Sequence, residues 1–171
     1  KPEYFDLALN SIDNQTVSPF EIILVEDGPL TLGLANVIDK YKKSWGKKLK
    51  IVKLRKNGGL GPALREGTKH VTTDWIARMD TDDVCVPERF EVQLDEIKKN
   101  PDYAIIGGQI DEFINNPKNI IGSRRVPLNQ YDIYNFARYR NPFNHPTVMI
   151  NRSKLVKVGG YTASDRLEDY N

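Results

Sequence analysis

Three carboxylates, Asp80, Asp82 and Asp83, stand within four residues at the end of an apolar segment. Neighbouring carboxylates repel one another, so this density is best explained by a cation that lies among them. The Asp-x-Asp spacing lets two of them share Mg²⁺ or Mn²⁺, whose octahedral shell is completed by water and phosphate oxygens. We therefore predict a divalent metal site here. The alternative is a solvated acidic turn before the helix predicted from Pro87.

The same carboxylates fit a second class of enzyme, the haloacid-dehalogenase-like phosphohydrolases. In that class an Asp-x-Asp pair follows an apolar strand and is followed two places later by Thr or Val, which Val84 satisfies. Asp80 would be the nucleophile and Asp82 the acid/base. Against this, that class carries the motif on the first strand of its domain, whereas two strands are predicted to precede it here. An EF-hand loop starting at Asp80 is excluded, because Val84 would have to be a ligand and Cys85 a glycine.

A second acidic strand end lies at Glu26, Asp27 and Gly28, directly after the apolar run Ile22–Val25. A carboxylate at the carboxyl end of a strand can accept hydrogen bonds from a nucleotide base or ribose. Asp-Gly is equally a common turn dipeptide, so both interpretations stay open for this pair on its own.

A glycine-rich segment from Asn57 to Gly67 leads into a helix that Pro62 begins. Its backbone N–H groups can face a phosphate, and Arg65, one turn into the helix, can reach a phosphate or a base. The segment has neither the lysine of a P-loop nor the G-x-G-x-x-G spacing of a dinucleotide fingerprint. An exposed arginine without a specific role is the alternative for Arg65.

Two signals stand towards the end of the chain. His145 lies in Asn-His-Pro-Thr before an apolar strand, and Glu168 and Asp169 follow Gly-Gly-Tyr. A single histidine is more often structural than catalytic. An acidic pair before a helix can simply complement the helix dipole.

The composition is that of an ordinary globular domain. Of 171 residues, 39% are hydrophobic and 28% are charged, which excludes disordered and repetitive chains. With 25 basic and 23 acidic residues, the net charge is only +2, so no nucleic-acid partner is expected. The lone Cys85 excludes an internal disulfide framework and fits a cytoplasmic location. No apolar run approaches the roughly 18 residues that a membrane span needs.

Apolar β-branched runs alternate with amphipathic segments, a pattern that predicts an α/β fold with a mostly parallel sheet. Strands are predicted at Ile22–Glu26, Leu49–Leu54, Trp75–Met79, Tyr103–Gln109 and Thr147–Ile150. Helices are predicted at Glu3–Asn14, Thr31–Lys43, Pro62–Val71, Pro87–Lys99 and Tyr131–Tyr139. Residues 115–125 are predicted as a loop or an irregular hairpin. In such folds ligands bind beyond the carboxyl ends of the strands, where the two acidic strand ends lie.

Taken in order, these motifs closely resemble those of a family 2 inverting glycosyltransferase with the GT-A fold. The segments that carry the resemblance are Ser11 with Gln15-Thr16, Ile22 to Gly28, Asn57 to Gly67, Asp80-Thr81-Asp82, Pro87 to Gln93, His145-Pro146-Thr147, Gly159-Gly160-Tyr161 and Glu168-Asp169. The resemblance implies a Rossmann-like, nucleotide-diphospho-sugar transferase fold, with a mostly parallel central sheet flanked by helices. Two departures are Glu66, where Asn is frequent, and Ala-Leu-Arg in place of a tighter Ala-Arg pair.

The resemblance also implies an activity and a set of roles. A sugar, expected to come from a UDP-sugar, would pass with inversion to a glycan or lipid-linked acceptor, as in polysaccharide, capsule or cell-wall biosynthesis. The implied roles are Asp82 and Asp80 for Mg²⁺ or Mn²⁺, Asp27, Asn57, Arg65, Asp80 and Thr81 for the nucleotide sugar, His145 for the acceptor side, and Asp169 with Glu168 for the catalytic base. A non-catalytic nucleotide-sugar-binding module is the alternative outside enzymes.

The same resemblance implies one catalytic domain over residues 1–171, with a nucleotide-binding part at about 1–83 and an acceptor-binding part at about 84–171. The family's first strand is expected before Lys1 and further sequence after Asn171, so we expect the domain to extend beyond this chain at both ends. Peripheral association with the inner face of the cell membrane would depend on those further parts. The oligomeric state is not predicted.

Overall fold

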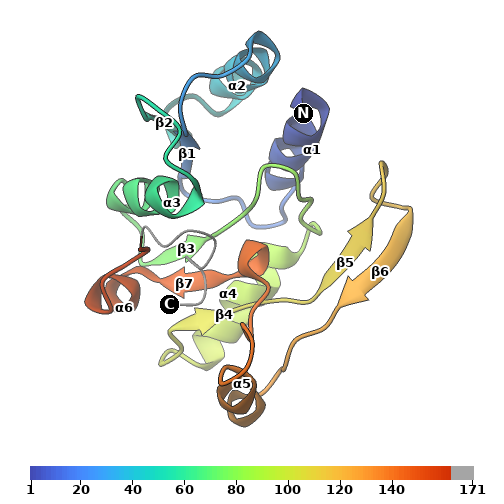
Figure 1. Ribbon diagram of the computed structural model, residues 1–171, viewed down its shortest axis with the longest axis vertical. Coiled ribbons are helices and arrows are strands. Elements are labelled where there is room, and N and C mark those ends of the chain that lie inside the picture. The colour runs from blue at the N-terminus through green and yellow to red at the C-terminus, as the bar shows by residue number, and fades with distance from the viewer. Residues whose placement is uncertain (163–171) are drawn as a thin grey trace.

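The computed structural model describes residues 1–162, in which helices and strands alternate as an α/β fold (Figure 1). The strands are β1 (Ile22–Glu26), β2 (Leu49–Lys53), β3 (Trp75–Ala77), β4 (Ile105–Ile106), β5 (Ile110–Phe113), β6 (Ile120–Arg124) and β7 (Met149–Asn151). The helices are α1 (Pro2–Asp13), α2 (Leu32–Trp45), α3 (Leu60–Lys69), α4 (Arg89–Lys99), α5 (Gln130–Phe136) and α6 (Arg152–Lys157), with 3-10 turns η1 (Gly46–Lys48) and η2 (His145–Thr147). No helix among these residues is long and apolar enough to cross a membrane.

The parallel pair β1 and β2 is packed between helices on two faces. Side chains alternate along a strand, so Ile22 and Leu24 pack against α1 and α2, whereas Val25 faces α3. The core on the first face consists of Phe5, Leu9, Ile38, Tyr41, Trp45 and Leu49. On the second face α3 comes so close that a Cβ on Gly67 would lie 2.9 Å from Val25 Cγ2. Burial on both faces explains why the run is continuously apolar.

The second sheet contains β3, β7 and β4 in that order. β7 lies in the middle and runs antiparallel to both neighbours, with Ile150 opposite Ile76 on one side and Ile105 on the other. α4 covers this sheet through a core of Phe90, Ile97 and Met149. β5 and β6 form a separate antiparallel hairpin with an irregularity near Glu112, which extends away from the other strands in Figure 1.

The prediction of α/β alternation and of parallel pairing at β1 and β2 is confirmed, but β7 departs from the parallel pattern. A long connection over residues 107–148 separates β4 from β7, so the short right-handed crossover that forces parallel pairing does not apply. The predicted strand Tyr103–Gln109 is shortened to β4, and residues 115–125 contribute to the irregular hairpin.

An apolar slot of about 530 Å³ separates the two sheets. β1 pairs with β2 and β3 pairs with β7, and the slot lies between β1 and β3. Its walls include Ile22, Ile23 and Leu24 from β1 and Trp75, Ile76 and Ala77 from β3. Asp80 and Thr81, which follow β3 after Arg78 and Met79, also line it.

Candidate functional site

Asp27 and the glycine-rich loop meet at the carboxyl end of β1. The Asp27 carboxylate accepts hydrogen bonds from the backbone N–H groups of Gly58 at 2.8 Å and Gly59 at 2.9 Å. The side chain of Asn57 also accepts from the Gly59 N–H at 3.1 Å. Gly28 makes this approach possible, because its φ is 94° and a Cβ there would lie 2.7 Å from the backbone nitrogen of Asn57. The fold therefore brings the predicted nucleotide residues Asp27 and Asn57 together.

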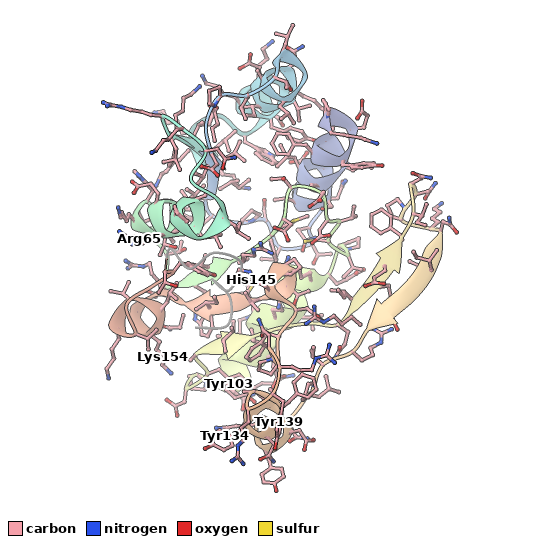
Figure 2. The ribbon with its side chains drawn as sticks, viewed as in Figure 1. Arg65, Tyr103, Tyr134, Tyr139, His145 and Lys154 are labelled. Carbon is pink, nitrogen blue, oxygen red and sulfur yellow. The ribbon has the colours of Figure 1, made fainter. Side chains whose placement is uncertain are left out.

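This geometry corrects the expectation that the loop offers free N–H groups to a phosphate. The N–H groups of Gly58 and Gly59 already donate to Asp27, since a carboxylate is a stronger acceptor than water for two neighbouring amides. Arg65, the third predicted nucleotide contact of this region, is exposed on α3 (Figure 2). Its role in binding stays a prediction.

The acidic segment begins with an ion pair at the end of β3. Arg78 is only 5% exposed, and its two terminal nitrogens lie 2.7 and 2.5 Å from the two carboxylate oxygens of Asp80. The Asp80 side chain is 35% exposed, so one side of the carboxylate meets the buried arginine and another is accessible. A bidentate pair of this kind is shorter and stronger than a neutral hydrogen bond. The buried Arg78 therefore fixes the position of the Asp80 carboxylate.

The next carboxylates leave negative charge unneutralised. Thr81 and Asp82 are exposed, whereas Asp83 is half-buried. Burial raises the pKa of Asp83 above its usual range, and the charges of Asp80 and Asp82 raise it further. Accumulated negative charge on hard oxygen atoms suits Mg²⁺ or Mn²⁺. Among residues 1–162 no three His, Cys, Asp or Glu side chains gather closely enough to form a metal site by themselves, so water and substrate oxygens would have to complete the shell.

Buried polar side chains from α1 and its end hold the segment that follows the carboxylates. Ser11 Oγ accepts from the Cys85 N–H at 3.0 Å. The amide of Gln15 donates to the Val86 carbonyl at 2.8 Å and accepts from the Phe90 N–H at 3.1 Å. This gives a physical reason for the Ser-x-x-x-Gln spacing at the start of the chain: it binds the loop between the carboxylates and α4.

Two side chains of α4 connect the acidic segment to the predicted acceptor-side region. Arg89 donates to the Arg78 carbonyl at 2.8 Å and to Gln93 Oε1 at 3.1 Å. Gln93 in turn donates to the Thr147 carbonyl at 2.7 Å. The N–H of Arg78 also donates to the Val148 carbonyl at 2.9 Å. The acidic segment and η2 therefore form one hydrogen-bonded unit.

The two predicted acceptor-side motifs lie together. His145 Nε2 is 3.2 Å from the Tyr161 hydroxyl, and the two rings are tilted with their centroids 5.7 Å apart. Figure 2 shows His145 beside β7. The preceding Asn144 is only 1% exposed and donates to the Gly108 carbonyl at 2.9 Å, which fixes the turn that presents the histidine. Glu168 and Asp169 lie outside the described residues.

Arg78 and Arg89 are the supporting residues that sequence reasoning missed. Arg78 did carry a signal, because it is the single charged side chain in the run Trp75–Met79 and stands two places before Asp80. Alternation along a strand places residues two apart on the same face, which makes an ion pair between them feasible. Arg89 lies in the segment from Pro87 to Gln93 that carries the family resemblance, but its contact with the Arg78 carbonyl was not predicted, since a helical arginine is usually solvated.

Comparison with known proteins identifies related sequences. A family model described as glycosyl transferase family 2 matches residues 1–160. The chain is 40% identical over 171 residues to the amylovoran biosynthesis glycosyltransferase AmsE of Erwinia amylovora, covering 100% of this chain and 63% of that protein. It is 39% identical over 171 residues to a UDP-Gal:alpha-D-GlcNAc-diphosphoundecaprenol beta-1,3-galactosyltransferase of Escherichia coli, covering 99% of this chain and 60% of that protein. The chain thus spans about three-fifths of the length of these relatives.

A solved structure supports the fold. The mannosyltransferase PcManGT from Pyrobaculum calidifontis, in complex with GDP-Man and Mn²⁺, superposes with a TM-score of 0.71 at 16% identity, covering 99% of this chain and 47% of that one. At this identity the similarity concerns the fold alone. The predicted α/β GT-A fold is confirmed.

Proposed function

Because the chain belongs to glycosyl transferase family 2, we propose that it forms the catalytic core of an enzyme of polysaccharide biosynthesis. A sugar would pass from a UDP-sugar, with inversion, to a glycan or lipid-linked acceptor. The observation that carries the proposal is the anchored acidic segment after β3, with Asp80 held by Arg78 and Asp82 exposed. The name of the Escherichia coli relative, which pairs a UDP-sugar with a lipid-linked acceptor, supports the donor and acceptor classes.

The phosphohydrolase interpretation is not retained. Both oxygens of Asp80 are bound to the buried Arg78, whose positive charge makes the carboxylate a weaker nucleophile, although its accessible side can still meet a cation. The match to glycosyl transferase family 2 also argues against a phosphohydrolase.

In the proposed reaction this chain supplies three functions. Asp82, with Asp80 beside it, would hold Mg²⁺ or Mn²⁺, which when bound supplies positive charge to the departing diphosphate. Asp27, Asn57, Arg65, Asp80 and Thr81 would bind the nucleotide sugar. Asp169, oriented by Glu168, would remove the proton of the acceptor hydroxyl on the opposite face of the sugar, with His145 on the acceptor side.

The family resemblance implies one more strand, which would precede Lys1. We propose that this strand occupies the slot between β1 and β3. A strand there would pair with both neighbouring strands and cover apolar walls. Because Asp80 and Thr81 also line the slot, that strand would end beside the nucleotide site. Residues 1–83 would then be the nucleotide-binding part and residues 84–171 the acceptor-binding part.

The test is a substitution of the proposed base in the full-length protein. We expect Asp169→Asn to lower turnover by about 10²- to 10⁴-fold, because a general base contributes in that range. UDP binding, measured by calorimetry, should stay unchanged. Glu168→Gln is the matched control and should lower turnover less. Near wild-type turnover in Asp169→Asn would refute the base assignment, and absence of transfer in the wild type with intact UDP binding would favour the non-catalytic binding module.

A further inference from the structure

The backbone of Arg78 is held through both its N–H and its carbonyl group. Its N–H donates to the Val148 carbonyl at 2.9 Å, and its own carbonyl accepts from Arg89 at 2.8 Å. The side chain is 4% exposed. A guanidinium so placed has little conformational freedom, and nothing about its position depends on a bound ligand.

The buried guanidinium requires a counterion, and Asp80 is the one that the fold provides. The two terminal nitrogens contact the two oxygens of Asp80, while Nε has no hydrogen-bond partner among the described residues. A buried charge without its partner is strongly unfavourable. Asp80 is therefore confined to one position by a residue that does not itself reach the surface.

Asp82 provides the contrast within the same segment. It is exposed and forms no salt bridge within residues 1–162. Its carboxylate keeps the rotational freedom of a surface side chain, and ordering it on binding has an entropic cost. The Asp80 side chain is already ordered in the folded protein by its ion pair with Arg78, so ligand binding need not order it.

We propose that Arg78 is a positioning residue for donor binding, which holds Asp80 in the orientation that the nucleotide meets. The proposal rests on the proposed function and assigns to that site a residue that touches neither substrate nor metal. Preorganised groups strengthen binding because less order has to be imposed when the ligand arrives. Lysine at this position would keep the charge but lose the planar two-point contact, since its ammonium is a single point charge.

The experiment compares Arg78→Lys with the wild type in the full-length protein. UDP and GDP are titrated by calorimetry, with MnCl₂ and with EDTA, and thermal unfolding is followed separately. We expect Arg78→Lys to weaken binding of the preferred nucleotide by about tenfold or more at temperatures where the protein is folded. In turnover assays KM for the donor should rise with kcat nearly unchanged.

Arg152→Lys is the matched control. Arg152 is half-buried and donates to the carbonyl of Thr73 at 2.8 Å, at the opposite end of β3 from the carboxylates. This variant should lower thermal stability without changing nucleotide affinity. A double-mutant cycle adds Asp80→Asn. Once Asp80 is replaced, changing Arg78 to Lys should have little further effect on affinity.

The possible outcomes separate the two proposals. If neither UDP nor GDP binds to the wild type, the proposed function fails. If the wild type binds and the folded Arg78→Lys variant binds equally well, with or without lower stability, Arg78 has only a structural role and the inference is overturned. Should Arg78→Lys not fold, Arg78→Gln, which keeps a planar donor group, is titrated in the same way, and unchanged affinity in that variant overturns the inference as well.

Discussion

Asp27 and Asp80 occupy equivalent places in the two sheets and are held in different ways. Asp27 directly follows β1, Asp80 lies shortly after the end of β3, and each was predicted to contact the nucleotide. Asp27 accepts from two backbone amides of the glycine-rich loop, whereas Asp80 is paired with the buried Arg78. The loop around Gly58 is exposed, so its contacts with Asp27 can rearrange when a ligand arrives. The contrast suggests an adaptable first carboxylate and a rigid second one.

The largest effect should come from the acidic segment. We expect Asp82→Ala to weaken Mn²⁺-dependent UDP binding by roughly a hundredfold, because this exposed carboxylate is the proposed ligand of the cation. Asp27→Ala should weaken UDP binding with and without Mn²⁺ by similar factors. Calorimetry with MnCl₂ and with EDTA distinguishes the two patterns. Mn²⁺-dependent binding that survives Asp82→Ala would contradict the assignment of Asp82 as a metal ligand.

The rigidity of the Asp80 region also depends on Gln15. Replacing this buried side chain in Gln15→Leu leaves the Val86 carbonyl and the Phe90 N–H without their partner, and we expect a loss of about 2–3 kcal/mol in the free energy of unfolding. Gln109→Leu is a control, because Gln109 makes the same two kinds of bond to Val126, far along the chain from the carboxylates.

Urea denaturation measures the stability of both variants. UDP affinity should fall in Gln15→Leu and stay unchanged in Gln109→Leu. Equal UDP affinities in the two folded variants would show that the contacts of Gln15 do not influence the site.

Glu21 joins the two sheets at the ends of the strands opposite to the site. Burial alone would raise the pKa of Glu21, but hydrogen bonds from Lys50 and Thr72 and the Lys50 charge outweigh it and lower the pKa from 4.5 to about 2. The ionised form is therefore favoured in the folded state. Its contribution is complete above the unfolded pKa near 4.5 and is lost as the pH falls towards 2.

We accordingly expect Glu21→Gln to lower the free energy of unfolding by about 2 kcal/mol at pH 7. The difference from the wild type should shrink steadily below pH 4.5. Urea denaturation at a series of pH values measures it. A difference that stays constant from pH 7 to pH 3 would mean that the ionic contacts of Glu21 do not carry the effect.

The smallest effect should come from the adaptable carboxylate. Asp27→Asn keeps one acceptor oxygen but puts an N–H₂ group opposite a loop N–H. We therefore expect the local stability of the glycine-rich loop to fall by about 1 kcal/mol. Faster hydrogen exchange at the amides of Gly58 and Gly59 would report it. The same measurement on Asp80→Asn should leave those two amides unchanged, because Asp80 is held by a separate contact.

Many of the elements around the two acidic strand ends were predictable from local patterns. The bounds of β1, Ile22–Glu26, agree with the prediction, and α4 was placed to within two residues at its start, because continuous apolar runs and helical periodicity are local properties. The predicted strand at Trp75–Met79 ends earlier than expected, at Ala77. Arg78 follows it, with its side chain turned to Asp80, which no local pattern required.

The contacts that hold the site were not predictable in the same way. Asp27 with Gly58, and Gln15 with Val86, join residues far apart in the chain. The antiparallel β7 depends on a long connection whose path periodicity does not encode. Side-chain type shows that a group can donate or accept, whereas its partner depends on which segments the fold brings within hydrogen-bonding distance.

The sequence by itself determined the α/β class and the placement of carboxylates after two apolar strands, since strand periodicity and residue chemistry are both local. Only the tertiary structure decided how those carboxylates are held. Asp27 became the acceptor for a loop from the next crossover, and Asp80 became the counterion of a buried arginine. The physical reason is that burial and charge pairing depend on packing, which is set by the whole chain.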